Sequence, residues 1–276
     1  MPELPEVEHV TRALHRRVAG RSIIKAELKR QRLAPDITPR MFDKRLAGAS
    51  INFIHRRGKH ILLDLDNGRT LIVHLRMSGR FMLLSPDETD PKFAHAVFHF
   101  GDDSRLVFDD QRHFGLMKLV ETAKLFEAKE LSKLAPEPFS DEFSPEYLAD
   151  TVRSSGRVLK EILLDQTRVC GVGNIYASEA MFLSGVDPRK RGNTVSKPKC
   201  ERLYRNIKAV LADAIEMQKL IKPHPTAIGE GVYGNGSEMR WLVYDKEGEP
   251  CPVCGSPIKR IVQGSRSTYY CSKCQR

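Results

Sequence analysis

The chain has 276 residues, with 45 lysines and arginines against 35 aspartates and glutamates, a formal net charge of +10. This length allows about two domains with a substantial buried core, and the basic excess indicates a polyanionic partner. Hydrophobic residues make up 41% of the chain and no apolar run is long enough to cross a bilayer, which excludes a disordered chain and a helical membrane protein.

The N-terminal segment predicts a helix that begins almost at the first residue. Val7, Val10, Leu14 and Val18 recur near a 3.6-residue period, and Gly20 ends the pattern. Acids and bases alternate over the same segment, without the apolar stretch of a secretory signal peptide. We therefore expect a soluble, intracellular protein.

Short β-rich runs follow, from about residue 22 to residue 120. Hairpin-like turns such as Asp66-Asn67-Gly68 separate several of them. Many short strands joined by local turns predict an antiparallel sandwich or barrel. The runs are residues 22–28, 51–54, 60–65, 70–75, 80–84, 96–100, 105–108 and 116–120.

A proline-punctuated segment, residues 134–138, marks the start of a second domain, because the helical period returns after it. The predicted helices are residues 145–152, 157–165, 175–183 and 199–217. Residues 218–238 contain four glycines and two prolines with little periodicity, which predicts a long loop of the functional or mobile kind.

Four of the six cysteines form two Cys-x-x-Cys pairs near the end of the chain. They are Cys251, Cys254, Cys271 and Cys274. Four thiolates at this spacing predict one tetrahedral structural zinc ion, with no open position for a catalytic water. A module this small folds on its metal, and the basic turn from Gly264 to Thr268 would then be rigid enough to enter a nucleic acid groove.

Two other features allow both a functional and a purely structural interpretation. Paired glycines at residues 171–173 precede Asn174, a candidate N-cap whose helix start could bind a phosphate, although a tight helix–helix turn is the simpler interpretation. Met77 and Phe114 lie beside arginines at predicted strand ends. They could be core residues next to a solvated basic face, or a wedge that enters a base stack, and the pattern leaves both open.

The N-terminus also has two interpretations. Removal of the initiator methionine would expose Pro2 as a secondary amine with a pKa near ~8, and an amine of this kind forms iminium adducts. Glu3 and Glu6 could then supply acid and base functions. On these residues alone, an ordinary helix start with acidic N-terminal charges is the simpler interpretation.

Three motifs in one order resemble the formamidopyrimidine-DNA glycosylase family, and the resemblance covers essentially the whole chain. They are the opening residues 2–8, the stretch 164–177 and the terminal four-cysteine module. The resemblance implies an α+β fold, with an N-terminal helix on an antiparallel eight-stranded β-sandwich, a helical helix-two-turns-helix domain and a C-terminal zinc finger, and with DNA in the cleft between the lobes. The expected domains are residues 1–135, 136–245, with a lesion-capping loop at about 218–238, and 246–276.

The resemblance also implies a role for individual residues. Pro2 corresponds to the nucleophile, Glu3 to a general acid and Lys59 to a lysine that assists elimination. Arg266 corresponds to a phosphate contact associated with the final elimination. The expected DNA-binding residues are His74, Met77, Arg112, Phe114, Lys160 and Asn174, of which Met77, Arg112 and Phe114 fill the void left by the everted base.

The implied activity is that of a base-excision repair enzyme. It removes oxidised purines such as 8-oxoguanine and formamidopyrimidines through a Schiff base at Pro2, and it cleaves the strand by β,δ-elimination. The implied partner is damaged double-stranded DNA, with one structural zinc ion and no redox cofactor. We expect a monomer in the cytoplasm, associated with the nucleoid and not with a membrane.

Three departures from the family pattern keep alternatives open. The capping loop lacks the usual Gly-Gly start and reads Lys219 to Thr226 with two prolines. Phe93 replaces the first histidine of a His-x-His pair that retains His95, and Ser155 occupies a basic position. The altered loop leaves open a preference for oxidised pyrimidines or abasic sites, and Phe93 and Ser155 leave open that some phosphate contacts are lost or relocated. A non-catalytic protein that binds damaged DNA is the alternative from another class.

Overall fold

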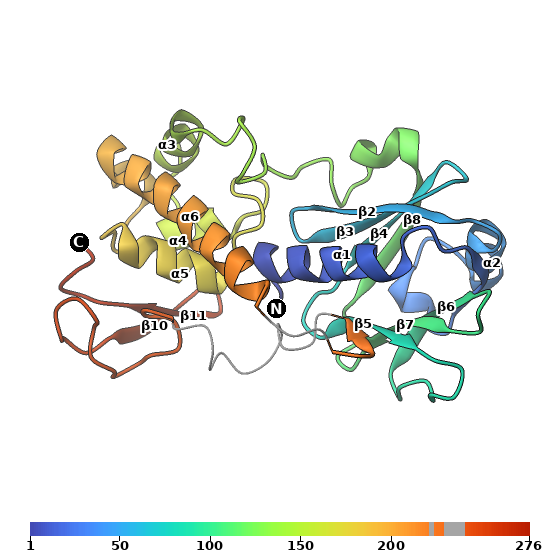
Figure 1. The fold of residues 1–276 in the computed structure, drawn as a ribbon. Coiled ribbons are helices and arrows are strands. Elements are labelled where there is room, and N and C mark those ends of the chain that lie inside the picture. The colour runs from blue at the N-terminus through green and yellow to red at the C-terminus, as the bar shows by residue number, and fades with distance from the viewer. Residues whose placement is uncertain (221–223, 229–240) are drawn as a thin grey trace. The chain divides into compact units, whose positions relative to one another are not determined.

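The computed structural model describes residues 1–220, 224–228 and 241–276, and its contacts separate the chain into two units (Figure 1). The first unit contains residues 1–132 and 218–234, and the second contains residues 133–217 and 235–276. Within the described residues, every helix is too short or too polar to span a bilayer. Residues 221–223 and 229–240, which include most of the predicted capping loop at about 218–238, lie outside the described part of the chain.

Two antiparallel sheets form the first unit and appear as separate layers in Figure 1. One sheet has the order β2 (Ile51–Arg57), β3 (His60–Leu65), β4 (Arg69–His74), β8 (Leu116–Glu121). The other has the order β1 (Ile23–Leu28), β6 (Ala94–Phe100), β7 (Arg105–Asp110), β5 (Gly79–Leu84), β9 (Ala227–Ile228). The eight predicted strands all form, which confirms the β-sandwich.

Strand β9 was not predicted, because it lies inside the segment expected to be a loop. Its two residues, Ala227 and Ile228, pair with Met82 and Phe81 of β5. Both β9 side chains are buried, and Ile228 joins the main core of the first unit. A two-residue apolar pair is too short to show the alternation that identifies a strand in a sequence.

Two helices cover the sandwich. Helix α1 (Leu4–Val18) packs on β2, with its predicted apolar face buried. Helix α2 (Pro39–Leu46) packs on β1 and was not predicted. Its N-cap is Thr38, whose hydroxyl accepts the Met41 N–H at 3.3 Å, and it buries only Phe42 and Leu46. Two buried positions in eight residues are too few to establish a helical period. Two short 3-10 helices, η1 (Gln31–Leu33) and η2 (Thr122–Glu127), complete the unit.

Two connections of the sandwich pass from one sheet to the other. The first crossing, residues 75–78, joins β4 to β5, and the second crossing, residues 111–115, joins β7 to β8. Because β4 pairs with β8 and β5 pairs with β7, the two crossings lie side by side. They carry Met77 and Phe114, which are far apart in the sequence.

The second unit is helical, with a small hairpin near its C-terminus. Its elements are α3 (Pro145–Arg153), α4 (Leu159–Leu164), α5 (Asn174–Leu183), the 3-10 helix η3 (Gly192–Thr194), α6 (Lys197–Gln218), β10 (Lys259–Gln263) and β11 (Arg266–Tyr270). The four predicted helices are present, which confirms the helical domain, and the hairpin of β10 and β11 lies within the predicted finger module. Strand β11 packs against α5.

Two local predictions in this unit are wrong. Asn174 is not an N-cap, because Gly173 takes that position with an extended backbone and Asn174 is the first helical residue. The turn predicted to run from Gly264 to Thr268 has only two residues in the structure. Gly264 and Ser265 both have positive φ, +54° and +62°, as a type I′ hairpin requires, and Arg266 already belongs to β11.

A buried carboxylate attaches residues 242–244, which lead into the finger module, to helix α5. Glu179 of α5 accepts the backbone N–H groups of Leu242, Val243 and Tyr244 at 2.8, 3.0 and 2.8 Å. Trp241 adds an edge-to-face contact with Tyr176 of the same helix, with ring centroids 5.5 Å apart. Hydrogen bonds to a carboxylate are among the strong ones in proteins, so the segment before the finger module is held firmly against α5.

His60 makes the stability of the first unit depend on pH. Burial on β3 lowers the pKa of His60 from 6.5 to about 4. Since the unfolded imidazole titrates near ~6.5, the unfolded state takes up a proton that the folded state excludes, and stability falls as the pH falls through this range. The contribution of His60 is complete above about pH 6.5 and is lost towards pH 4, by up to roughly 3 kcal/mol.

We therefore expect wild-type protein to lose more unfolding free energy than His60→Leu between pH 7.5 and pH 4.5. Urea unfolding followed by far-ultraviolet circular dichroism measures the difference. Fluorescence is unsuitable, because the single tryptophan, Trp241, belongs to the second unit. Parallel pH profiles for the two proteins would show that His60 does not titrate as its burial requires.

Candidate active site

The predicted nucleophile and its acid lie at the start of α1. Pro2 and Glu3 are both buried, and Glu3 is the N-cap of the helix, with an extended backbone. The Glu3 N–H donates to Oε2 of Glu6 at 2.7 Å, which satisfies one of the N–H groups that a helix start leaves unpaired. Pro5 follows in the first turn, where its fixed φ favours the helix. The backbone next to Pro2 is therefore held by the helix itself.

Glu6 has a second partner from a distant part of the chain. Its Oε1 accepts the side-chain amide of Gln218 at 3.1 Å, and both side chains are buried. With one oxygen on Glu3 and the other on Gln218, Glu6 positions the N-terminal turn. Sequence reasoning missed Gln218, because no local pattern connects residues 212 positions apart.

An ion pair joins α1 to the hairpin that carries Lys59. Arg56 Nε donates to Glu8 Oε2 at 2.8 Å, and Arg56 Nη1 donates to the Gly58 carbonyl at 2.9 Å. Burial alone would raise the pKa of Glu8, but hydrogen bonds and charge from Arg56 and Arg12 outweigh it and lower that pKa. Glu8 is therefore ionised at neutral pH, and it fixes the hairpin relative to the helix.

Lys59 occupies the second position of a two-residue turn between β2 and β3. Arg57 and His60 close this turn as a strand pair, and Gly58 has φ +58°. Glycine at the first turn position is the requirement of a type II′ hairpin. Lys59 itself is buried. The turn and the Arg56 contact together give this lysine a defined place next to the strand pair.

His74, at the end of β4, is a neutral hydrogen-bond donor. Burial, followed by the nearby His60, Arg76 and Lys59 groups, holds the pKa of His74 well below 6.5. Its Nδ1 accepts the Arg76 N–H at 2.9 Å, so the neutral ring carries its proton on Nε2. A donor of this kind suits a phosphate oxygen, as expected for a DNA contact.

The two crossings bring together the three residues expected to fill the void in DNA. Met77 and Phe114 are 43% and 48% exposed, which excludes the interpretation of both as core residues. Arg112 is exposed, with its guanidinium carbon 5.6 Å from the centroid of the Phe114 ring. Two large apolar side chains and one cation thus lie on neighbouring connections of the first unit.

The predicted phosphate contacts of the second unit meet at the finger hairpin. Lys160 is fully buried on α4, and its Nζ donates to the Ser267 carbonyl at 2.8 Å and to Thr268 Oγ1 at 2.6 Å. Asn174 Nδ2 donates to the same Ser267 carbonyl at 3.0 Å, while its Oδ1 is buried without a protein partner. Lys160 and Asn174 therefore position β11, which begins at the exposed Arg266.

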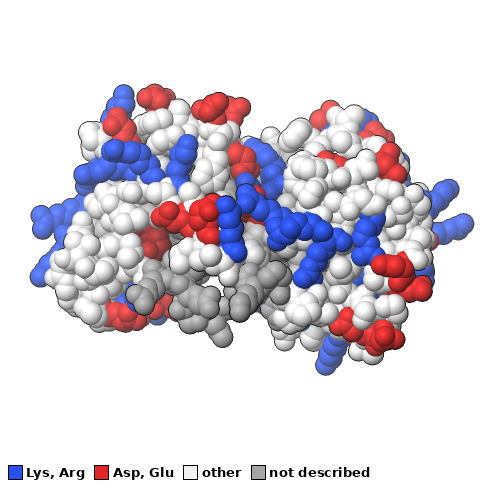
Figure 2. Space-filling model, viewed as in Figure 1, with Lys and Arg blue, Asp and Glu red and all other residues white. Residues whose placement is uncertain are grey.

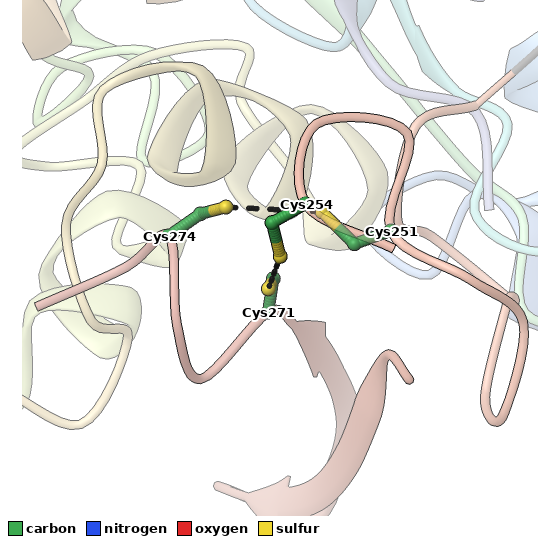
Figure 3. Close-up of side chains that lie close together, drawn as sticks. All are labelled: Cys251, Cys254, Cys271 and Cys274. Atoms are coloured by element: carbon green, nitrogen blue, oxygen red, sulfur yellow. Dashed lines mark hydrogen bonds between the residues drawn. The ribbon is translucent and has the colours of Figure 1, made fainter. Parts of the chain in front are cut away.

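The four predicted metal ligands converge, as Figure 3 shows. Their sulfur atoms all lie within 4.8 Å of one another, with Cys251–Cys274 and Cys254–Cys271 distances of 3.8 and 3.5 Å. Zinc–thiolate bonds of about 2.3 Å in a tetrahedron place the sulfurs roughly 3.8 Å apart, so the cluster fits one zinc ion. The structure thus confirms the predicted four-cysteine site.

Gln275 supports this site from outside the ligand set. Its Oε1 accepts the Cys271 N–H at 2.9 Å, and its Nε2 donates to the Val186 carbonyl at 2.9 Å. Sequence reasoning did not identify this role.

On the face that Figure 2 shows, basic side chains are exposed on both units, with acidic ones among them.

Comparison with known families matches all three parts of the chain. Residues 1–117 match the formamidopyrimidine-DNA glycosylase N-terminal domain, and residues 134–224 match the formamidopyrimidine-DNA glycosylase H2TH domain. Residues 248–276 match the zinc finger found in Fpg and in IleRS. The order of these matches is the order expected from the sequence motifs.

Relatives and solved structures agree with the domain matches. The formamidopyrimidine-DNA glycosylases of Chloroflexus aggregans and Bacillus subtilis are 40% and 38% identical to the whole of this chain, which covers 98% and 99% of them. A Lactococcus lactis Fpg in complex with an abasic site containing DNA has a TM-score of 0.90 and 33% identity, over 99% of both chains. A mutant of that protein with a Fapy-dG containing DNA has a TM-score of 0.91 and 34% identity, over the full length of both chains. This chain belongs to the formamidopyrimidine-DNA glycosylase family.

Proposed function

We propose that the protein is a bifunctional DNA glycosylase and AP lyase that removes oxidised purines from double-stranded DNA. The observation that carries the proposal is the buried N-terminal turn, which holds Pro2 and Glu3 in a fixed geometry linked to Lys59 through Glu8 and Arg56. The names of the relatives and the Lactococcus complex with Fapy-dG containing DNA support the purine substrate. The protein works as a monomer in the cytoplasm, on nucleoid DNA.

In the first chemical stage, a bond between C1′ and Pro2 replaces the bond between C1′ and the damaged base. Once Met1 is removed, the Pro2 nitrogen attacks C1′ of the lesion nucleotide and loses its proton, and the bond from C1′ to the base breaks as the departing base takes up a proton. Glu3 gives its proton to the sugar ring oxygen as the ring opens, which leaves an iminium ion between Pro2 and C1′. General acid catalysis by a positioned carboxyl group contributes about 10²- to 10⁴-fold in rate.

The second stage cuts the strand. The iminium ion acidifies the hydrogens on C2′, so loss of one proton expels the 3′ phosphate, and a second elimination expels the 5′ phosphate. Lys59 assists these proton transfers, and Arg266 contacts a phosphate during the final step. His74 contacts the DNA backbone, whereas Lys160 and Asn174, expected from the sequence to contact phosphates, act through the finger strand that they hold. The zinc ion supplies folding free energy to the finger that presents Arg266, and it takes no part in the reaction.

Base eversion precedes the chemistry. Extruding a nucleotide costs a few kcal/mol, and less for a damaged pair. Met77 and Phe114 fill the space that the base leaves, while Arg112 replaces lost contacts with the orphaned partner base. The exposure of Met77 and Phe114 at the ends of rigid strands suits this role.

Borohydride trapping tests the nucleophile. We expect reduction during reaction with 8-oxoguanine duplex to give one covalent complex, whose adduct maps by mass spectrometry to Pro2. A form with one extra residue ahead of Pro2 has no free imino group and should give no complex and no strand cleavage. An adduct on Lys59 or another internal lysine would contradict the assignment. Tight binding of abasic DNA without any cleavage would favour the non-catalytic alternative.

A different lesion preference is the second candidate function. Residues 219–226 lack the family's usual loop start, and the Lactococcus protein has also been solved with an oxidised pyrimidine containing DNA, at a TM-score of 0.90. We expect single-turnover excision of 8-oxoguanine and formamidopyrimidine to exceed that of thymine glycol by about tenfold or more, as a site that hydrogen-bonds its substrate discriminates. A clear preference for thymine glycol would replace the purine assignment.

Removal of the metal should separate DNA binding from N-terminal chemistry. We expect Cys251→Ser to lose its zinc and to bind duplex at least about tenfold more weakly, because the finger unfolds and its phosphate contacts disappear. Fluorescence anisotropy at several salt concentrations measures the affinity, with a flatter salt dependence expected. Cys200→Ser, a buried cysteine of α6, is the matched control and should keep one zinc ion per chain. Unchanged DNA affinity in zinc-free Cys251→Ser would contradict the prediction.

A further inference from the structure

A fully buried carboxylate lies beneath the two crossings and belongs to no step described above. Asp110 is the last residue of β7 and is 0% exposed. Its Oδ2 accepts the backbone N–H of Gly115 at 2.7 Å, within the second crossing. Its Oδ1 accepts the hydroxyl of Ser78 at 2.5 Å, within the first crossing. One side chain therefore bonds to both connections.

Ser78 completes the link between the crossings. Its hydroxyl oxygen accepts the backbone N–H of Arg112 at 3.0 Å while the hydroxyl hydrogen points to Asp110. The chain of bonds runs from Asp110 through Ser78 to the residue that carries the inserting cation. Met77 is the immediate neighbour of Ser78, and Phe114 is the immediate neighbour of Gly115. Met77 and Phe114 are thus each one residue away from this hydrogen-bond network.

Close packing beneath the network removes other arrangements. A Cβ atom on Gly79 would lie 2.5 Å from the Leu75 carbonyl and 2.6 Å from the Phe108 ring. A Cβ atom on Gly115 would lie 2.7 Å from the same ring and 3.1 Å from Asp110 Oδ2. The two glycines let both crossings rest on one buried phenylalanine, which Phe81 contacts edge to face at 5.2 Å.

The second crossing has one more attachment, from β6. His113 has a left-handed backbone, φ +62°, and its Nδ1 lies 2.9 Å from Nε2 of His95, with the two rings stacked. Phe93, which stands where the family pattern has a histidine, contacts the His113 ring edge to face. The loop is therefore fixed at Arg112, at His113 and at Gly115, while the side chains of Arg112 and Phe114 remain exposed.

We propose that Asp110, acting through Ser78, couples the two crossings, so that Met77, Arg112 and Phe114 enter DNA as one rigid body. Asp110 is a positioning residue for base eversion, and it contacts neither the sugar nor the base. The proposal rests on the function proposed above. It predicts a specific defect, because an abasic site has no base to extrude and depends less on insertion than a damaged base pair does.

Single-turnover kinetics on two duplexes test this coupling, one with 8-oxoguanine opposite cytosine and one with a preformed abasic site. We expect Ser78→Ala and Asp110→Asn to slow base excision by about 10- to 100-fold, since they remove or disrupt the buried hydrogen bond between Ser78 and Asp110 and misplace the inserting groups. Cleavage of the abasic duplex should stay within about threefold of wild type, because its chemistry uses Pro2 and Glu3. Ser78→Thr keeps the hydroxyl group and should restore excision.

A fluorescent base reports insertion directly. We expect 2-aminopurine next to the lesion pair to show slower unstacking with Ser78→Ala, and a normal rate with Ser78→Thr. Ser85→Ala is the matched control, because Ser85 also donates its hydroxyl to a carboxylate, Glu88 Oε2 at 2.8 Å, in an exposed turn after β5. It should match wild type in every assay. If thermal unfolding shows that Asp110→Asn is misfolded, Ser78→Ala decides the test alone. Ser78 is only partly buried, so its replacement by alanine should leave the fold intact.

The outcomes distinguish this proposal from the proposed function. If wild-type protein cleaves neither duplex, the function is wrong. If wild type is active and Ser78→Ala slows both duplexes equally, or slows neither, the function stands and the coupling is wrong. Loss confined to the 8-oxoguanine duplex, with rescue by Ser78→Thr, supports the coupling.

Discussion

The place of the reactive N-terminus depends on one hydrogen bond, from the backbone N–H of Glu3 to the carboxylate of Glu6. A chain end is normally the most mobile part of a domain. Here the bond ties the N-cap residue Glu3, and with it the neighbouring Pro2, to a helix whose apolar face is buried against β2. The ion pair between Glu8 and Arg56 extends the same frame to the next hairpin. A nucleophile at a free end thereby gains the rigidity of a core side chain, which catalysis by orientation requires.

The second unit uses comparable means for an exposed arginine. Arg266 begins β11, whose next residue, Ser267, accepts hydrogen bonds from Lys160 and Asn174. Four residues further along, Cys271 is a metal ligand, and Gln275 holds its backbone N–H. The strand is therefore fixed by two helices at one end and by the metal site at the other. A long, flexible side chain on such a strand loses less entropy when it binds a phosphate than one on a mobile loop does.

The sequence was sufficient for features that depend on local periodicity or spacing. The eight strands, the four helices of the second unit and the cysteine site all have repeating or closely spaced signals. Asn174 shows where such reasoning fails. Its residue type favours an N-cap, but its amide bonds to the Ser267 carbonyl, 93 residues away, and Gly173 takes the cap position with an extended backbone. A distant acceptor outcompetes a local preference, and no window of sequence contains that information.

The crossings show the same limit at the site itself. From the sequence, Met77 and Phe114 were equally compatible with a core and with a wedge, because both environments use large apolar side chains. The alternation of sheets along the chain decides between them, since it places residues 75–78 and 111–115 side by side in connections between the two sheets, where Met77 and Phe114 are exposed. Nearly half of each residue's surface is then exposed to water. By the hydrophobic effect, this exposure costs free energy in the protein without DNA. This cost is recovered when a partner buries the apolar surface of the two side chains. The gap left by an extruded base has the size and polarity to do so. The bonds from Asp110 to Ser78 and Gly115 then hold both side chains ready to enter that gap.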